Sequence, residues 1–298
     1  MSDQKWQRSR LRRLSATLTD QHHAVSHTTV GRLLVKLNYA LKATVKRLAG
    51  AAHPDRNRQF EYIEQPKHAF LAAGLAVISV DTKTKELIGT FKNAGRTWCQ
   101  AADEVNDHAC ATDAVGKAIP YGIYDLHHHC GSIYVGTSAD TPQFAVEMLA
   151  RWWQTAGQAS FPTAPHLLIL ADGGGSNGCR PRMWKQQLQE QLADRLGLEV
   201  TVCHYPRGAS KWNPIEHRLF GPISLNWAGK PLRTFDAMLA YIGGTTTVTG
   251  LRVNAELVDQ VYEKGRTVSA TAMHDLNIQF AEVCPKWNYT IRPRTACP

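Results

Sequence analysis

The stretch that decides the fold is residues 165–177, Pro165-His166-Leu167-Leu168-Ile169-Leu170-Ala171-Asp172-Gly173-Gly174-Gly175-Ser176-Asn177. Its apolar run is short and is followed by Asp172 and then by glycines, which predicts a strand buried on both faces of a sheet. The carboxylate thus stands at the end of the strand, and in open α/β sheets ligands bind where the strands end. Residues 75–81, Leu75-Ala76-Val77-Ile78-Ser79-Val80-Asp81, repeat this design. We therefore expect two buried strands, each ending in an aspartate that faces a crevice.

Strands and helices alternate around these two strands. Residues 86–98 predict a strand joined to 75–81 by a hairpin, and 121–126 and 132–136 predict two more. Helices are expected from Thr141-Pro142, over 182–196 with Gly197 as its end, and from Asn213-Pro214, with a strand at 198–204 between the last two. This order predicts an α/β fold with a mixed sheet flanked by helices.

The composition of the chain limits the class of protein to which it can belong. The chain has 298 residues, of which 43% are hydrophobic and 20% charged, as in an ordinary globular protein. No apolar run approaches the ~18 residues of a membrane span, and residues 1–13 lack the apolar core of a signal peptide. The seven cysteines form no C-x-x-C pair, which predicts free thiols in a reducing compartment such as the cytoplasm.

The positive charge is concentrated at one end of the chain. Residues 1–58 hold 12 Lys and Arg against 3 Asp and Glu, whereas the remaining residues hold 22 of each sign. Such a distribution is typical of a polyanion-binding module joined to a neutral domain. The alternative is a basic tail that only aids solubility.

Within this basic segment the apolar pattern is helical. Leu11, Leu14 and Leu18 form one stripe over residues 7–19. After a turn, Ser26 is expected to cap a second helix whose apolar stripe is Val30, Leu33, Leu34 and Leu37. Its opposite face carries candidate DNA-binding residues, Thr28, Thr29, Arg32 and Lys36. The pattern fits a helix-turn-helix, with any amphipathic helical hairpin as the alternative, and the local charge favours DNA. We place a linker near residues 50–60, at His53-Pro54-Asp55.

Three carboxylates are the candidate catalytic and metal-binding residues, Asp81, Asp172 and Glu216. The first two end strands, and the third lies in the first turn of a later helix. Carboxylates brought together repel one another unless cations join them. Hard divalent cations such as Mg²⁺ prefer oxygen ligands, and two of them can clamp the attacking and leaving oxygens of a phosphodiester.

Each carboxylate also has a purely structural explanation. Glu216 lies three residues after Asn213 and could close a capping box, and Asp81 could cap the turn at 82–84. Asp172 precedes glycines 173, 175 and 178, which match the G-x-G-x-x-G of dinucleotide-binding folds. That match fails on context, because the acidic residues about 20 positions on fall inside a helix rather than at a strand end.

Three blocks together resemble a known family. They are residues 78–83 (Ile-Ser-Val-Asp-Thr-Lys), 171–177 (Ala-Asp-Gly-Gly-Gly-Ser-Asn) and 210–218 (Ser-Lys-Trp-Asn-Pro-Ile-Glu-His-Arg). The chain resembles the DDE transposases of bacterial insertion sequences, in the branch related to mariner transposases, from about Val25 to Pro293. Further similar stretches are residues 243–247 and 287–290.

The resemblance implies an RNase H-like core that binds two Mg²⁺ or Mn²⁺ ions through Asp81, Asp172 and Glu216. It implies DNA transposition: metal-dependent strand cleavage and strand transfer at the ends of an insertion sequence. The implied partners are terminal-repeat DNA, target DNA and further copies of the chain. Residues 1–58 would be the helix-turn-helix segment and 59–298 the catalytic domain with a C-terminal extension. Members of that family usually carry a longer N-terminal region, so we expect a shortened copy.

Additional DNA-backbone contacts are expected near the scissile phosphate from Lys83, Lys211, Trp212 and Arg218, with core packing as the alternative for Trp212. The run His127-His128-His129-Cys130 contains metal-binding residue types, but consecutive side chains cannot all face one ion, so we predict a solvated loop. Two rival functions remain: an RNase H-like nuclease that does not join strands, and a catalytically inactive DNA-binding remnant.

Overall fold

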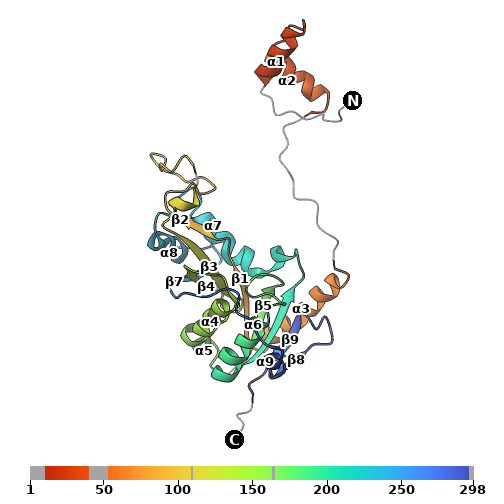
Figure 1. The fold of residues 1–298 in the computed structure, drawn as a ribbon, viewed down its shortest axis with the longest axis vertical. Helices are drawn as coiled ribbons and strands as arrows, with labels where there is room; N and C mark the ends of the chain where they lie inside the picture. Colours follow the sequence, from red (N-terminus) through yellow and green to blue (C-terminus); the bar gives the residue numbers. More distant parts are fainter. Residues whose placement is uncertain (1–10, 40–52, 109, 163–164, 295–298) are drawn as a thin grey trace. The chain divides into compact units, whose positions relative to one another are not determined.

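A computed structural model describes residues 11–39, 53–108, 110–162 and 165–294 (Figure 1). The chain divides into two compact units, residues 1–50 and 51–298. Among the described residues, no helix is both long enough and apolar enough to cross a membrane.

The first unit contains the two expected helices, α1 (Leu11–Asp20) and α2 (His27–Lys36). Ser26 caps α2 as predicted, because its hydroxyl accepts a hydrogen bond from the backbone N–H of Thr29. The predicted apolar stripe of α2 is only partly covered: Val30 is buried, but Leu33 and Leu37 are 45% and 65% exposed. Two short helices packed on each other cannot cover a full stripe, which is the physical reason for the difference.

The second unit is built on a mixed sheet. Within the described residues the strand order is β7-β4-β3-β1-β5-β6-β9-β8, and β2 pairs with β3 outside this path. The strands are β1 (Ala76–Thr82), β2 (Glu86–Ile88), β3 (Gly116–Asp125), β4 (Cys130–Gly136), β5 (His166–Asp172), β6 (Glu199–Tyr205), β7 (Arg252–Val258), β8 (Ile278–Phe280) and β9 (Asn288–Ile291).

Strand directions identify the fold class. β3 runs antiparallel to both β1 and β4, whereas β5 is parallel to β1 and β6 is parallel to β5. An antiparallel meander beside parallel strands around a central β1 is the RNase H-like arrangement. The predicted fold class is therefore confirmed.

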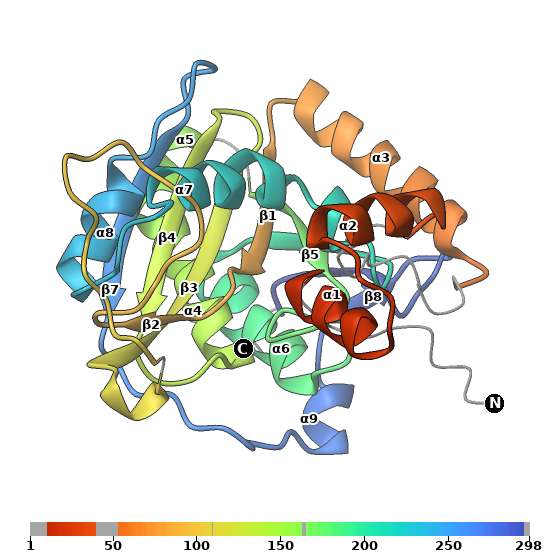
Figure 2. The same cartoon turned by 90° about the horizontal axis from the view of Figure 1, so that it is seen from above.

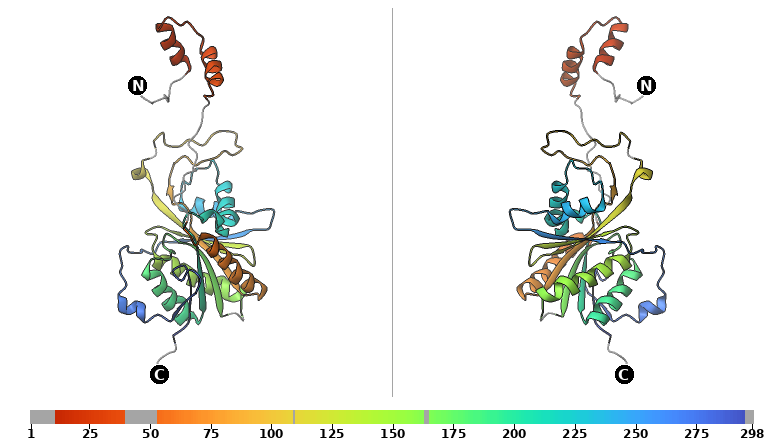
Figure 3. Two further views of the ribbon diagram at one scale, coloured as in Figure 1. Left: turned by 90° about the vertical axis from the view of Figure 1, so that its right-hand side faces the viewer. Right: turned by 90° about the vertical axis from the view of Figure 1, so that its left-hand side faces the viewer.

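Helices cover both faces of this sheet (Figure 3). On one face α4 (Pro142–Trp152), α6 (Arg182–Gln187) and the short π-helical segments η2 (Trp153–Gly157) and η3 (Leu188–Asp194) contribute to the main core. The short helix α5 (Gln158–Ser160) follows η2 and contributes no buried residue. On the other face lie α3 (Arg56–Ala72), the π-helical η5 (Glu216–Phe220), α7 (Gly221–Asn226) and α8 (Phe235–Gly243). Three short helices remain: η1 (Ala111–Asp113), η4 (Ser210–Trp212) and α9 (Ala270–His274).

One predicted strand is wrong in length and in partner. Residues 86–98 were expected to form a hairpin with 75–81, but only Glu86–Ile88 form a strand, and it pairs with β3. The reason is that β3 and β5 already occupy both edges of β1.

The boundary between the units also differs from the expected one. The division falls between residues 50 and 51, not 58 and 59, because residues 56–72 form the single helix α3. Gln59 and Ile63 on α3 are fully buried, and Gln59 donates a hydrogen bond to the carbonyl of His204 on β6. Residues 56–58 therefore belong to a helix of the core.

The histidine run forms the connection between β3 and β4. The Asp125 carboxylate accepts hydrogen bonds from the backbone N–H groups of His127 and His128. The rings of His127 and His128 are exposed, which agrees with the predicted loop.

Candidate active site

Asp81 and Asp172 lie side by side at the end of two neighbouring parallel strands. In the β1–β5 register Val80 pairs with Ala171, so the two aspartates occupy the next pair of positions. Side chains alternate between the faces of a strand, and Ala76, Ile78, Val80, Ile169 and Ala171 fill the main core. Both carboxylates therefore belong to the opposite face, which α3 and η5 cover.

Glu216 begins η5 on that same face, and a buried network ties this helix to β1. The Ser79 hydroxyl on β1 donates to the Asn213 side-chain carbonyl and accepts from the backbone N–H of Ile215 at 3.1 Å. The Asn213 amide donates to the carbonyl of Val80 at 3.2 Å. We call these two side chains the Ser79–Asn213 clamp. The backbone N–H of Glu216 donates to the backbone carbonyl of Asn213 at 3.1 Å and not to its side chain, so Asn213 does not form the side-chain half of a capping box with Glu216.

The three carboxyl groups affect one another electrostatically. Burial, helped by the charge of Asp172 and then by those of Glu216 and Asp140, raises the pKa of Asp81 to about 8. Burial and the charge of Glu216 raise the pKa of Asp172 to about 6. The pKa of Glu216 is also raised by burial, although His217 and Lys83 oppose the effect. Strongly raised carboxyl pKa values on converging strand ends are typical of a functional site.

A cavity of about 730 Å³ opens at these strand ends. It is lined by Asp81, Thr82, Lys83, Thr84, Lys85, Leu87, Ala111, Lys117, Asp140, Asp172, Gly174 and Gly175. Oδ1 of Asp172 is buried and has no hydrogen-bond partner among the described residues. Buried, mutually repelling carboxylate oxygens fit hard divalent cations, which would remove both the repulsion and the unpaired acceptor.

The side chains are not gathered into a finished metal site. Among the residues that the structure describes, no group of three or more His, Cys, Asp or Glu side chains is arranged to hold an ion. The donor set therefore fits divalent cations in its chemistry, with Asp81 and Asp172 lining the cavity and Glu216 outside its lining.

The glycine-rich loop after β5 has a backbone that requires glycine at two positions. Gly175 has a φ of +72°, and a Cβ on Gly178 would lie 2.9 Å from the backbone carbon of Gly174. The loop is fixed to β6, since Nε2 of His204 lies 3.0 Å from the carbonyl oxygen of Asn177. The glycines thus let the chain turn tightly beside Asp172.

The predicted DNA-binding residues divide into exposed and buried ones. Thr28, Thr29, Arg32 and Lys36 are all exposed on α2. In the second unit Lys211 and Arg218 are exposed, and Trp212 is 55% exposed with its ring edge against Phe60, so it is not a core residue.

Lys83 differs from these residues. It is only 8% exposed, its ammonium lies 3.0 Å from Glu86, and it sits 4.5 Å from the centre of the Trp227 ring. A buried and paired lysine is poorly placed to reach a DNA backbone. Its charge instead acts on Glu216.

Sequence reasoning missed Asp140 and the Ser79–Asn213 clamp. Asp140 accepts a hydrogen bond from Thr82 at 3.2 Å, pairs with Lys85 at 3.3 Å and helps to raise the pKa of Asp81. A signal was present, because Asp140 follows the strand at 132–136 and precedes a helix, just as the other aspartates follow strands. The clamp has no comparable local signal.

Comparison with known proteins gives one family and several structures. The family model for the Rhodopirellula transposase DDE domain matches residues 1–293. Among solved structures, the Mos1 transposase paired-end complex with left transposon end is similar with a TM-score of 0.43 and 13% identity, over 80% of this chain and 70% of that chain. The Mos1 strand transfer complex gives 0.44 and 13% over the same shares. No curated protein matches.

Proposed function

The chain belongs to the DDE transposase family, and we propose that it cleaves DNA at the ends of an insertion sequence and joins the freed ends to target DNA. The observation that carries the proposal is the register of β1 and β5, which sets Asp81 beside Asp172 on the face where η5 presents Glu216. Burial and repulsion, which raise the pKa of all three carboxyls, support a shared role for them.

We assign the binding of two Mg²⁺ or Mn²⁺ ions to these three residues. When bound, such ions would activate the attacking oxygen and stabilise the leaving oxygen of a phosphodiester. Asp81 and Asp172 would contribute carboxylate oxygens from rigid strand ends, and Glu216 would complete the set from η5. The Ser79–Asn213 clamp would fix η5 so that Glu216 stays within reach of the strand ends.

DNA recognition is assigned to the first unit. Residues 1–50 hold 10 basic and 2 acidic residues, and α2 exposes Thr28, Thr29, Arg32 and Lys36 on its surface. We propose that α1 and α2 form a helix-turn-helix that binds the terminal repeats. Lys211, Trp212 and Arg218 would contact the backbone near the cut, and copies of the chain would assemble on DNA in the bacterial nucleoid.

The test is a cleavage and joining assay with the full chain, a labelled duplex that carries the element's end and a supercoiled target plasmid. Mg²⁺ or Mn²⁺ should give both a nicked duplex and a joined product. Asp172→Asn should abolish both while leaving binding of the duplex nearly unchanged, because a neutral amide is a poor ligand for hard cations.

The same assay separates the rival functions. Cleavage without a joined product would identify a nuclease of the same fold. Binding without metal-dependent cleavage would identify a DNA-binding remnant. Cleavage at the wild-type rate by Asp172→Asn would show that Asp172 is only a turn residue.

A further inference from the structure

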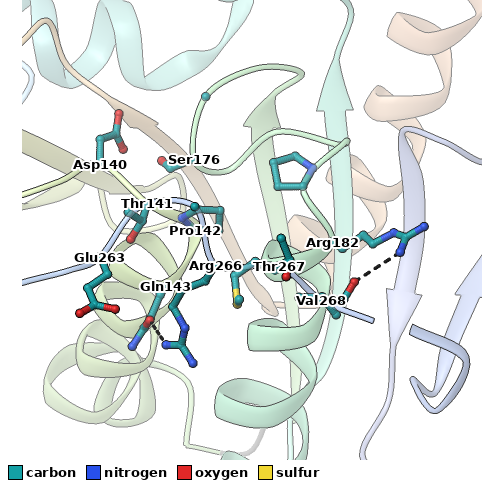
Figure 4. A pocket seen from close by; sticks show the side chains of 14 residues that line it. Asp140, Thr141, Pro142, Gln143, Ser176, Arg182, Glu263, Arg266, Thr267 and Val268 are labelled. Carbon is teal, nitrogen blue, oxygen red and sulfur yellow. Dashed lines mark hydrogen bonds between the residues drawn. The ribbon is translucent and has the colours of Figure 1, made fainter. Parts of the chain in front are cut away.

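A second cavity, of about 620 Å³, is shown in Figure 4, and it shares lining residues with the active-site cavity. Its walls are the start of α4, the glycine-rich loop, the start of α6 and part of residues 259–269, which we call the strap. Figure 2 shows the strap running from β7 to α9. Asp140 and Gly175 line both cavities, so a polymer whose phosphate sits at the active site has its next unit within reach of the second cavity.

The strap is fixed to the fold although it has no regular structure. The Ser138 hydroxyl donates to the carbonyl of Gln260 and accepts from the N–H of Tyr262, both at 3.1 Å. The buried Tyr262 ring packs on Phe144 of α4 with ring centres 5.2 Å apart. This wall of the cavity is therefore held in place by the core.

Two arginines at the rim lack a carboxylate partner. Arg182 and Arg266 are exposed, and within the described part of the chain their guanidinium groups bond a backbone carbonyl at 3.3 Å and the Gln143 amide at 2.6 Å. Four other exposed or half-buried arginines do pair with carboxylates, namely Arg151, Arg233, Arg292 and Arg294. Guanidinium groups that have no carboxylate partner and lie beside the carboxylates of the active site are suited to binding a phosphate group.

Negative charge in the lining is modest. The lining contains two carboxylates: Asp140, which is paired with Lys85 at 3.3 Å, and Glu263, which is exposed to solvent on the strap. Within the described residues neither carboxylate forms an ion pair with Arg182 or Arg266, so both guanidinium groups keep donors that can turn to a phosphate.

The interior combines apolar walls with one unpaired polar group. Pro142, Pro181, Met183 and Val268 supply apolar surface. The Ser176 hydroxyl, on a residue only 5% exposed, has no hydrogen-bond partner among the described residues. Flat apolar surface with a hydrogen-bonding group is what a nucleobase requires, and a cavity of a few hundred Å³ suits one such unit. A base that is stacked and paired within a duplex cannot enter it.

We propose that this cavity holds one unpaired nucleotide of the DNA substrate, beside the phosphodiester at Asp81 and Asp172, with its phosphate bound by Arg182 and Arg266. The inference rests on the proposed function, because it takes DNA as the substrate of the neighbouring site.

The test measures binding alone, with the full chain in EDTA. Fluorescence anisotropy compares a blunt duplex of mixed sequence with the same duplex that carries a short single-stranded tail. A second tailed probe has abasic sites in the tail, so that it keeps the phosphates and lacks the bases. Wild type should prefer the normal tail over the blunt end by about tenfold, the scale of one charge-assisted contact, and should prefer the abasic tail less.

Three variants make the test specific. Arg182→Gln with Arg266→Gln should remove the preference for the tail while the affinity for the blunt duplex changes little. Arg151→Gln with Arg195→Gln removes the same two charges elsewhere and should keep the preference. Thr267→Trp fills the cavity without changing charge and should remove the preference for the normal tail over the abasic tail.

Equal binding of tailed and blunt DNA by wild type would overturn the proposal, as would an unchanged preference in the rim variant or an equal loss in the control. Because no metal is present, a failure of the cleavage assay leaves these measurements intact, and the two proposals can fail separately. Thermal unfolding of each variant serves as the folding control, and each should melt as the wild type does.

Discussion

At the scale of single residues, the site depends on polar groups that are buried where apolar ones would pack more easily. Ser79 and Asn213 are both fully buried, yet each satisfies its polar atoms through the other or through β1. A buried polar pair is retained at little cost only when every atom is bonded. The pair therefore fixes the position of η5 relative to the end of β1 more sharply than an apolar contact would.

Replacing Asn213 with alanine should weaken the site more than the fold. The change removes the acceptor of the Ser79 O–H and the side-chain donor to the Val80 carbonyl, at a cost of about 1–3 kcal/mol in the free energy of unfolding. Because Glu216 would lose its fixed position, the Mn²⁺ concentration needed for half-maximal cleavage should rise at least several-fold, while DNA affinity stays constant.

The matched control is Asn288→Ala. Asn288 is also fully buried and its amide is fully used, but it bonds Gln59 and Val283, away from η5. It should destabilise the protein to a similar extent without shifting the Mn²⁺ requirement. Equal shifts in both variants would show that Asn213 acts only through stability.

The raised carboxyl pKa values predict how stability depends on pH. Asp81, with a pKa of about 8, holds a proton in the folded chain at pH values where the unfolded chain has lost it. Since the folded state then binds more protons, the free energy of unfolding in EDTA should fall as pH rises toward 8. Burial lowers the pKa of His204 to about 4. Below about pH 6.5 the unfolded chain therefore binds a proton at His204 that the folded chain does not, and this residue makes the free energy of unfolding rise with pH in that range.

Thermal unfolding at about pH 7 and about pH 8.5, with EDTA or Mn²⁺, tests this dependence. The melting temperature in EDTA should fall between these values, and Mn²⁺ should restore it, by about 5 °C at saturation, more at the higher pH. Asp81→Asn should flatten the pH dependence and lose the response to metal. A wild-type melting temperature that does not fall with pH in EDTA would contradict the assigned pKa.

At the scale of elements, glycines on the sheet allow η5 to approach it closely. A Cβ on Gly131 of β4 would lie 2.3 Å from Cδ1 of Leu219, and one on Gly122 of β3 would lie 2.5 Å from Cε1 of Phe220. Leu219 and Phe220 belong to the helix that carries Glu216. The distance between this helix and the sheet therefore depends on the two positions being glycine, one on β3 and one on β4.

Gly131→Ala should therefore lift η5 and displace Glu216. Overpacking of this kind costs about 1–3 kcal/mol, and cleavage should fall further than the loss of folded protein explains. Gly136→Ala is the control on the same strand, since its Cβ would meet Phe144 of α4 at 2.9 Å, on the opposite face. If the two variants lose equal activity at equal stability, η5 is not the element that matters.

The accuracy of sequence reasoning varied between elements for physical reasons. The strands that carry Asp81 and Asp172 could be predicted, because an apolar run that is too short for a helix and is bounded by polar or glycine residues is typical of a buried strand. The segment 86–98 could not, because its loose alternation does not reveal that β3 competes for the edge of β1. The clamp joins residues 134 positions apart, so Ser79 could be recognised only as part of a buried strand.

At the scale of the whole molecule, charge and fold divide the chain at nearly the same place. Residues 1–50 hold 10 basic and 2 acidic residues, whereas residues 51–298 hold 24 and 23. The second unit contains the entire sheet and all the helices packed on it, α3 included. Deleting residues 1–50 should therefore leave a folded core, whereas a cut after residue 58 would remove the first turn of α3.

The truncated chain, residues 51–298, tests where DNA recognition resides. Each phosphate contact adds about 0.9 to the slope of log affinity against log salt, so removing the basic unit should flatten that slope by several units. Preference for the element's end over a scrambled duplex should disappear as well, while weak binding persists through exposed residues near the cut such as Lys211 and Arg218. Salt titrations by fluorescence anisotropy on both duplexes measure these effects, with circular dichroism to verify folding. A folded core that keeps the full slope and the preference would place recognition in the second unit and leave residues 1–50 as a solubilising tail.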